Sequence, residues 1–141
     1  MQTTPKLYPF QAIDLTLIDT YVRLPKAAME KQENGPGYTV VYDGKVLGCF
    51  GVVIPWTGFG MAWSVPTVEL FKKWPIWTTR TVRLTLRTII KSFDLYRVEL
   101  VAAGENAERW AELLGFSPEG PYAHNYGARG INVKRYELIN G

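Results

Sequence analysis

The stretch from Val98 to Phe116, VELVAAGENAERWAELLGF, constrains the fold more than any other part of the chain. An apolar strand pattern runs through a turn of small residues into a short helical pattern that stops at Gly115, as helices often do at glycine. Phe116 then begins a new extended segment. Strand, helix and strand in this order predict a β-α-β unit, and therefore a fold in which helices pack on a sheet.

Length and composition predict a single domain. The 141 residues, 47% of them hydrophobic, suffice for one full core but not for two, so we expect one domain over residues 1–141. No apolar run approaches the roughly 20 residues of a transmembrane helix. The first ten residues, MQTTPKLYPF, lack the charged start and apolar centre of a signal peptide. These features predict a cytoplasmic protein without membrane association.

Charge and cysteine content limit which ligands, disulfides and metal sites the chain can have. Lys and Arg number 16 against 13 Asp and Glu, and the resulting net charge of +3 favours acidic ligands only weakly. The single cysteine, Cys49, excludes an internal disulfide, and its apolar strand predicts a core residue rather than a nucleophile. The sequence has no metal-spaced cluster, Ser-His-Asp arrangement or Walker loop, so we expect no metal site.

Local signals in the first two thirds of the chain predict a meander followed by helices. A strong hairpin signal, Asp43-Gly44, stands between two strand patterns, YTVVY and KVLGCFGVVI. The pattern of Gly58–Val65 is typical of a third antiparallel strand. The segment VELFKKW predicts a short helix with Thr67 as its N-cap. A longer helix from about Ile76 to Ser92 follows, with Pro75 in its first turn.

Four weaker segments complete the prediction. Residues Tyr8 to Tyr21 mix strand formers with polar positions, and Pro25 to Glu33 has the composition of a short helix. Two final strands are expected around Tyr122 to Tyr126 and Ile131 to Leu138.

The long helix is predicted to have two different faces. The apolar face is formed by Val82, Leu86, Ile89, Ile90 and Phe93. The basic face is formed by Arg80, Arg83, Arg87 and Lys91.

This order of elements, together with Leu114-Gly115-Phe116, resembles the GNAT acetyltransferase superfamily. The resemblance implies an α/β (α+β) protein with the acyl-CoA N-acyltransferase fold, a mixed central sheet flanked by helices. The chain resembles in particular small GNAT-like proteins encoded by phages, which share the progression seen here at Arg109-Trp110, Leu114-Gly115-Phe116 and Glu119-Gly120.

The resemblance implies acetyl-CoA in a V-shaped opening between the fourth and fifth strands, here Gly58–Val65 and Leu95–Ala102. Backbone groups at the end of the fourth strand contact the pantetheine arm in that family, which nominates Trp63, Ser64 and Val65. The pyrophosphate docks on free amides at the start of the long helix, where the helix dipole favours an anion.

This chain departs from the family at the start of the long helix. The segment KKWPIWTTR lacks the usual Gly-x-Gly or Gly-x-Ala step, so Trp77, Thr78, Thr79 and Arg80 are the residues there that would meet the cofactor. The alternative for each residue singly is structural, with tryptophans as core anchors, threonines as caps and basic residues on a solvated face.

The catalytic positions of the family are also altered. Alignment from Gly115-Phe116 puts Gly104 where active relatives have an asparagine, and Ala111 where they have the tyrosine acid. Asn106, two residues late, is either a remodelled cofactor contact or an ordinary early helix residue. Transfer to an amine needs a base, because an ammonium cannot attack a thioester. Glu69 and His124 are the candidate bases; alternatively, Glu69 is an exposed helix carboxylate and His124 a surface loop residue.

Two functions therefore remain open. One is an acetyl-CoA-dependent N-acetyltransferase acting on a primary amine of a protein or small molecule. The other is a catalytically inactive GNAT-fold phage protein that binds a host protein or belongs to the virion, located in the host cytoplasm or the particle. The 5 Trp and 8 Tyr residues favour this binding module, since aromatic side chains anchor interfaces. A homodimer is compatible with both, and nucleic-acid binding is disfavoured because the basic stripe is helical.

Overall fold

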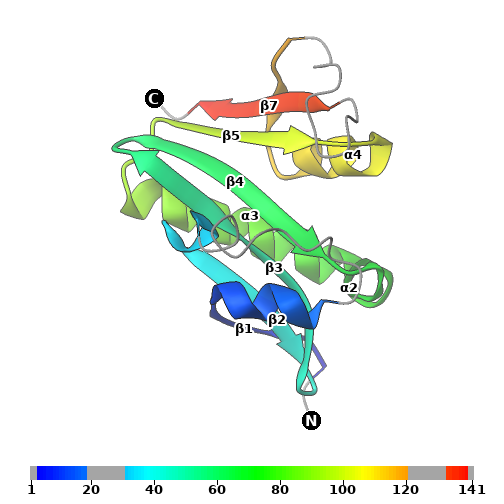
Figure 1. The fold of residues 1–141 in the computed structure, drawn as a ribbon. Coiled ribbons are helices and arrows are strands. Elements are labelled where there is room, and N and C mark those ends of the chain that lie inside the picture. Colours follow the sequence, from blue (N-terminus) through cyan, green and yellow to red (C-terminus); the bar gives the residue numbers. More distant parts are fainter. Residues whose placement is uncertain (1–2, 19–30, 121–132, 140–141) are drawn as a thin grey trace.

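A twisted mixed sheet forms the centre of the computed structural model, which describes residues 3–18, 31–120 and 133–139 (Figure 1). Within these residues the strand order is β1-β2-β3-β4-β5-β7-β6. Only β4 and β5 pair in parallel, and the other neighbours are antiparallel. The strands are β1 (Lys6–Pro9), β2 (Gly37–Tyr42), β3 (Lys45–Trp56), β4 (Phe59–Pro66), β5 (Arg97–Ala102), β6 (Ser117–Pro118) and β7 (Lys134–Ile139). The predicted mixed sheet is confirmed.

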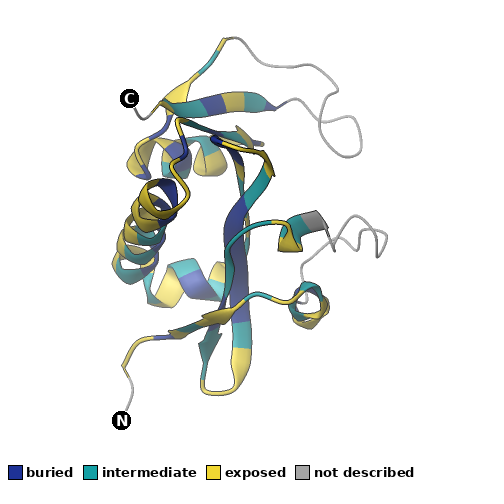
Figure 2. Cartoon of the chain, turned by 90° about the vertical axis from the view of Figure 1, so that its left-hand side faces the viewer, coloured by how far each residue is buried: buried dark blue, intermediate teal, exposed yellow. Residues whose placement is uncertain are grey.

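Helices lie on both faces of this sheet. Figure 2 shows the described α-helices on one face and the described short 3-10 helices on the other. None of the described helices is long and apolar enough to cross a membrane. The α-helices are α2 (Val68–Lys73), α3 (Pro75–Ser92) and α4 (Glu105–Leu113), and the 3-10 helices are η1 (Ala12–Leu17) and η2 (Lys31–Glu33).

The strongest local signals predicted their elements correctly. Asp43 and Gly44 adopt the positive φ angles of a tight hairpin turn, 51° and 74°. The Thr67 hydroxyl accepts a hydrogen bond from the Leu70 N–H at 3.3 Å and caps α2. Pro75 is the first residue of α3, where its missing N–H costs nothing.

Two predictions are wrong in part. Of the stretch from Tyr8 to Tyr21, residues 8–18 are described, and within them only the beginning is a strand; η1 follows because the Asp14 carboxylate accepts bonds from the Gln11 N–H at 3.1 Å and the Thr39 hydroxyl at 2.6 Å. Phe93 was expected on the buried face of the long helix. It is 48% exposed, because α3 ends at Ser92 and Phe93 follows as its C-cap.

Other expectations fall partly outside the described residues. Of the helix predicted at Pro25–Glu33, only η2 is described. The strand predicted at Tyr122–Tyr126 lies outside the described residues. The strand predicted at Ile131–Leu138 corresponds to β7.

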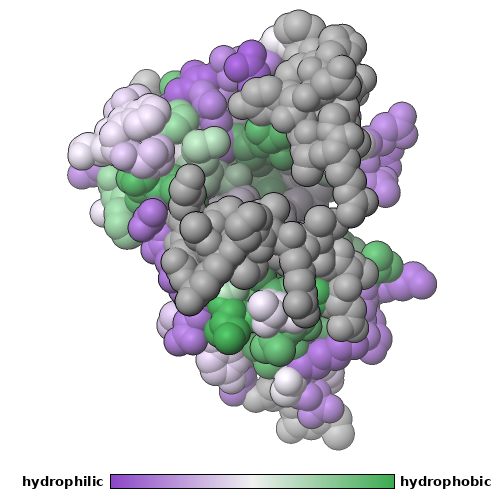
Figure 3. Space-filling model, viewed as in Figure 1, coloured by the Kyte–Doolittle hydropathy of each residue, from purple (hydrophilic) through white to green (hydrophobic). Residues whose placement is uncertain are grey.

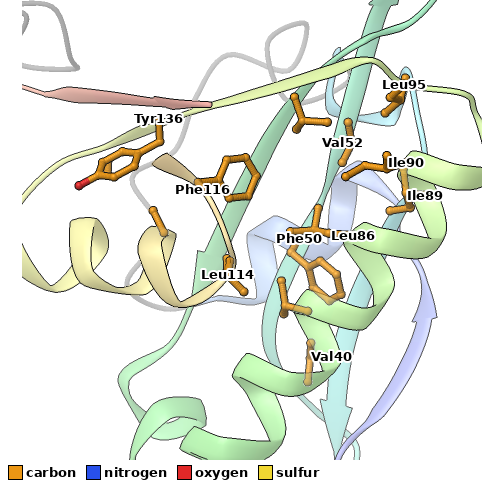
Figure 4. Packing of buried hydrophobic residues seen from close by; sticks show 14 of the residues in the cluster. Val40, Phe50, Val52, Leu86, Ile89, Ile90, Leu95, Leu114, Phe116 and Tyr136 are labelled. Carbon is orange, nitrogen blue, oxygen red and sulfur yellow. The ribbon is translucent and has the colours of Figure 1, made fainter. Parts of the chain in front are cut away.

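The main core lies between the sheet and the α-helices. The predicted apolar face of α3 packs on residues from β2, β3 and β5. The β-α-β unit adds a second group of core residues around the fully buried Tyr136 (Figure 4). The central members are Val40, Phe50, Val52, Val82, Leu86, Ile89, Ile90, Leu114, Phe116 and Tyr136. Burial of these side chains is the main source of stability and fixes α3 and α4 on one face of the sheet.

Cys49 belongs to a second, smaller core under η1. It packs with Leu15 and Ile18 and is 2% exposed, which confirms the predicted core role. Burial raises the pKa of its thiol from 9.0 to about 12, against a smaller opposing effect of the hydrogen bond to Thr39. The thiolate is the reactive form of cysteine, so Cys49 is unsuited to nucleophilic chemistry.

The raised pKa of Cys49 predicts a loss of stability at high pH. The neutral thiol stabilises the fold fully below pH 9.0, and this contribution disappears as the pH rises towards about 12. We expect the free energy of unfolding in urea to fall more between pH 8 and pH 10.5 for the wild-type chain than for Cys49→Ala. Parallel pH profiles for the two proteins would show that the buried thiol does not titrate in this way.

Candidate functional site

The site begins where β4 and β5 part. The two strands pair only over Phe59–Met61 and Arg97–Glu99. Beyond these pairs, β4 stays bonded to β3 as far as Pro66, while β5 stays bonded to β7 as far as Ala102. The sheet therefore divides into two diverging parts, as the ribbon shows (Figure 1). The predicted V-shaped opening between the fourth and fifth strands is present.

Ion pairs stabilise the β5 side of the sheet beside the closed end of this opening. The Arg97 guanidinium contacts the carboxylates of Glu99 at 2.7 Å, Glu119 at 2.8 Å and Glu137 at 2.8 Å. These residues belong to β5, the segment after β6, and β7. One cation thus joins three neighbouring segments at the level where β5 still pairs with β4.

A cavity of about 110 Å³ lies in the opening. β4 contributes Ala62–Ser64, β5 contributes Leu100–Ala102, and the remaining wall comes from β3, α3 and α4. The described residues that line it include no ionisable side chain. In the space-filling view, hydrophobic residues are visible along part of a recess in this region (Figure 3). Such a cavity suits an apolar chain with a few polar groups that bond to backbone.

Trp63 is held on the η1 face of the sheet. Its ring meets Phe10 edge-on at 4.7 Å, and it packs with the small core around Cys49. Gly51, its register partner on β3, leaves room for the indole, since a Cβ there would stand 3.2 Å from the ring and 2.6 Å from the Pro36 carbonyl oxygen. The indole N–H is buried without a hydrogen-bond partner in the described part of the chain. Trp63 therefore offers the cavity mainly its backbone.

The four residues predicted to meet a cofactor at the start of α3 do not converge on one point. Successive helical residues are rotated by about 100°. Thr78 points into the core and is 2% exposed, whereas Arg80 is exposed. Trp77 lines a small internal space together with Thr78. Thr79 accepts a hydrogen bond from the Trp110 indole. Of the four, Arg80 is the exposed residue, and Thr79 lies beside it in the outer groove.

Few backbone amides at the start of α3 are free to bind an anion. Pro75 has no N–H, and the N–H of Thr78 already donates to the Trp74 carbonyl at 3.0 Å. The amides of Ile76 and Trp77 are the remaining donors of the first turn. In addition, α2 separates the end of β4 from the start of α3. The residues present thus fit a pantetheine arm in the β4–β5 opening, while a diphosphate would depend on basic side chains rather than on an amide cradle.

Trp110 closes the passage between α3 and α4. Its Nε1 donates to Thr79 Oγ1 at 3.1 Å, and its ring meets Phe71 of α2 edge-on at 5.2 Å. Trp110 lines both the β4–β5 cavity and the small space beside Thr78. A ligand that leaves the cavity between α3 and α4 must displace this indole.

The other predicted site residues are dispersed. Glu69 lies outside the cavity lining and forms ion pairs with Lys45 at 3.5 Å and Lys73 at 3.9 Å. Asn106 is an exposed residue in the first turn of α4. Val65 packs in the small core around Cys49 rather than on the cavity. His124 lies outside the described residues and stays a prediction.

Sequence reasoning missed the contribution of α4. Ala107, Trp110, Ala111 and Leu114 line the cavity, and Ala111 occupies the wall where the resemblance expects a tyrosine. Their spacing of three and four residues places them on one face of α4. That spacing was a readable signal for a lining helix.

Known proteins resemble this chain in structure but not in sequence. No protein-family model matches the chain, and no curated protein matches it in sequence. A ribosomal-protein-S5-alanine acetyltransferase from Vibrio fischeri is similar with a TM-score of 0.72 and 17% identity, over 96% of this chain and 93% of that one. The chain has the GNAT fold. A variant of the spermidine N-acetyltransferase SpeG from Vibrio cholerae is also similar, with a TM-score of 0.70 and 15% identity, over 95% of this chain and 94% of that one.

Proposed function

We propose that the chain is an N-acetyltransferase that moves an acetyl group from acetyl-CoA to a primary amine. The observation that carries the proposal is the parting of β4 and β5 after Met61, which opens an apolar cavity beside a stretch of β4 without a strand partner on its β5 side. Backbone groups on such an edge can pair with the amides of a pantetheine arm, much as an added strand pairs with a sheet. When bound, acetyl-CoA supplies the activated thioester.

Different residues of this chain would bind different parts of acetyl-CoA. The backbone of Trp63, Ser64 and Val65 holds the pantetheine arm. The apolar wall of β5 and α4 keeps water from the thioester. Arg80 balances a phosphate charge on the exposed side of α3, and Asn106 is an exposed residue at the start of α4. Thr78 has no place in this version of the site because it is buried, whereas Thr79 keeps its own O–H as a donor beside Arg80.

Of the two predicted bases, we retain His124. Glu69 is held by two lysines and does not line the cavity. We expect kcat/KM of the wild-type chain to level off above the pH at which a histidine loses its proton, about 6.5. For His124→Ala we expect kcat/KM to keep rising with pH towards the pKa of the amine. A pH profile of release of coenzyme A measures both, and identical profiles would remove His124 from the mechanism.

The acceptor class is tested with probes suggested by the similar structures. Spermidine and a peptide with a free N-terminal alanine represent the two named substrates. A peptide with a blocked N-terminus and one lysine represents a protein side chain. Mass spectrometry of each mixture with acetyl-CoA detects an added acetyl group. Acetylation of at least one probe supports the proposal, and acetylation of none, with acetyl-CoA bound, moves the search to other amines.

The second candidate is the inactive binding module, here a phage factor that binds a host or virion protein. The observation that favours it is the closed passage at Trp110, together with a cavity lining that has no described ionisable group. Calorimetric titration with acetyl-CoA separates the two candidates. Saturable binding that weakens in Arg80→Ala supports the transferase. No binding by folded protein at millimolar acetyl-CoA supports the module.

A further inference from the structure

We propose that the groove between α3 and α4 binds an acidic amphipathic helix of a partner protein. The groove is formed by the basic stripe, defined as Arg80, Arg83, Arg87 and Lys91, and by apolar residues beside it. This proposal goes beyond acetyl transfer and shares with the proposed acetyl-CoA site the residue Arg80 of the basic stripe.

The charge of the groove is uncompensated. All four residues of the basic stripe are exposed, and within the described residues none forms an ion pair. By contrast, Lys45, Lys73 and Arg97 each have a carboxylate partner. Asp94 is the acidic residue that lines the groove, at its far end near Lys91. A row of four cations without carboxylate partners favours the binding of a ligand that carries carboxylates or phosphates.

Apolar side chains interrupt the positive charge. Ile76 is 71% exposed, Leu84 is 55% exposed, and Leu113 of α4 is 54% exposed, and all three line the same part of the groove. Exposed residues of this kind, set among charges of one sign, mark a surface that buries apolar area on binding. The occupant must therefore carry both carboxylates and apolar groups.

The spacing of the stripe favours a helix. From Arg80 to Lys91 the helix rises about 16 Å, with cations every three or four residues. A second helix has the same pitch, so carboxylates at matching intervals can meet all four cations while its apolar stripe covers Ile76 and Leu84. A nucleic-acid strand would satisfy the charge but leave these apolar groups without a partner. The groove lining also has no aromatic ring on which a base could stack.

The test uses fluorescence anisotropy with three labelled probes in 50 mM salt. The first is an 18-residue peptide of Glu and Leu with its leucines on one helical face, the second is the same composition scrambled, and the third is an 18-nucleotide single-stranded DNA. The variants are Arg83→Glu with Arg87→Glu in the groove, and Lys6→Glu with Arg135→Glu as a control elsewhere on the surface. Circular dichroism confirms that each variant is folded.

We expect the amphipathic peptide to bind saturably and at least fivefold more tightly than the scrambled peptide. The groove variant should weaken it at least tenfold and the control less than twofold. The peptide titrations contain no acetyl-CoA, so a failure of the proposed transferase would not affect this result. The proposal is overturned if the amphipathic peptide does not bind, if both variants weaken it equally, or if DNA binds more tightly.

Discussion

Gly51→Ala should lower the free energy of unfolding by about 3 kcal/mol, since forcing extra volume into a packed interior costs roughly 1–3 kcal/mol or more. A Cβ at this position would stand 2.6 Å from the Pro36 carbonyl oxygen and 2.7 Å from the Gly37 Cα. Both contacts are with backbone, which cannot rotate away. The register partner Trp63 would also be pushed, and with it the β4 edge of the opening.

Gly44→Ala is the matched control for this prediction. Gly44 has a φ of 74° in the hairpin turn, and a Cβ there would meet no atom within 4 Å. The control therefore carries only the conformational cost of a left-handed residue, about 1 kcal/mol. Urea denaturation measures both variants. If Gly51→Ala were no less stable than Gly44→Ala, the close approach of the Pro36-Gly37 backbone to Gly51 would be contradicted.

Ala107→Phe should weaken acetyl-CoA binding at least tenfold without unfolding the protein. Ala107 is exposed and yet lines the β4–β5 cavity from α4, so a phenyl ring there can cover the cavity without disturbing the core. In a cavity of about 110 Å³, a phenyl ring would occupy the space that the end of a pantetheine arm needs. The expected loss follows from exclusion of the ligand rather than from loss of a contact.

Arg109→Phe serves as the control for Ala107→Phe. It places the same ring two residues further along α4, at an exposed position outside the cavity lining. We expect this variant to bind acetyl-CoA within twofold of the wild-type chain by calorimetry. Equal loss in both variants would show that α4 contributes through its stability, and no loss in either would place the ligand elsewhere.

Much of the fold was predictable because its signals are local. The hairpin at Asp43-Gly44, the N-cap at Thr67 and the first-turn proline at Pro75 depend on a few adjacent residues. By contrast, η1 depends on the bond between Asp14 and Thr39, which are 25 residues apart. No pattern in the sequence of η1 itself reveals that bond.

The site was predictable in outline and less so in detail. The opening beside Trp63 and Ser64 followed from the order of the strands and the resemblance. The inward position of Thr78 had a signal, since it stands four residues before the buried Val82 on the same helical face. The bond from Trp110 to Thr79 had none, because it joins helices whose relative placement the sequence does not state.

Two-dimensional amide NMR during titration with acetyl-CoA tests the central claim, that the opening between β4 and β5 receives a pantetheine arm. Adenosine 3′,5′-bisphosphate, which lacks that arm, is the comparison ligand. We predict that acetyl-CoA shifts the amides of Ala62–Val65 and Leu100–Ala102, and that the comparison ligand leaves them in place. Shifts confined to the basic stripe, or equal shifts with both ligands, would contradict the account.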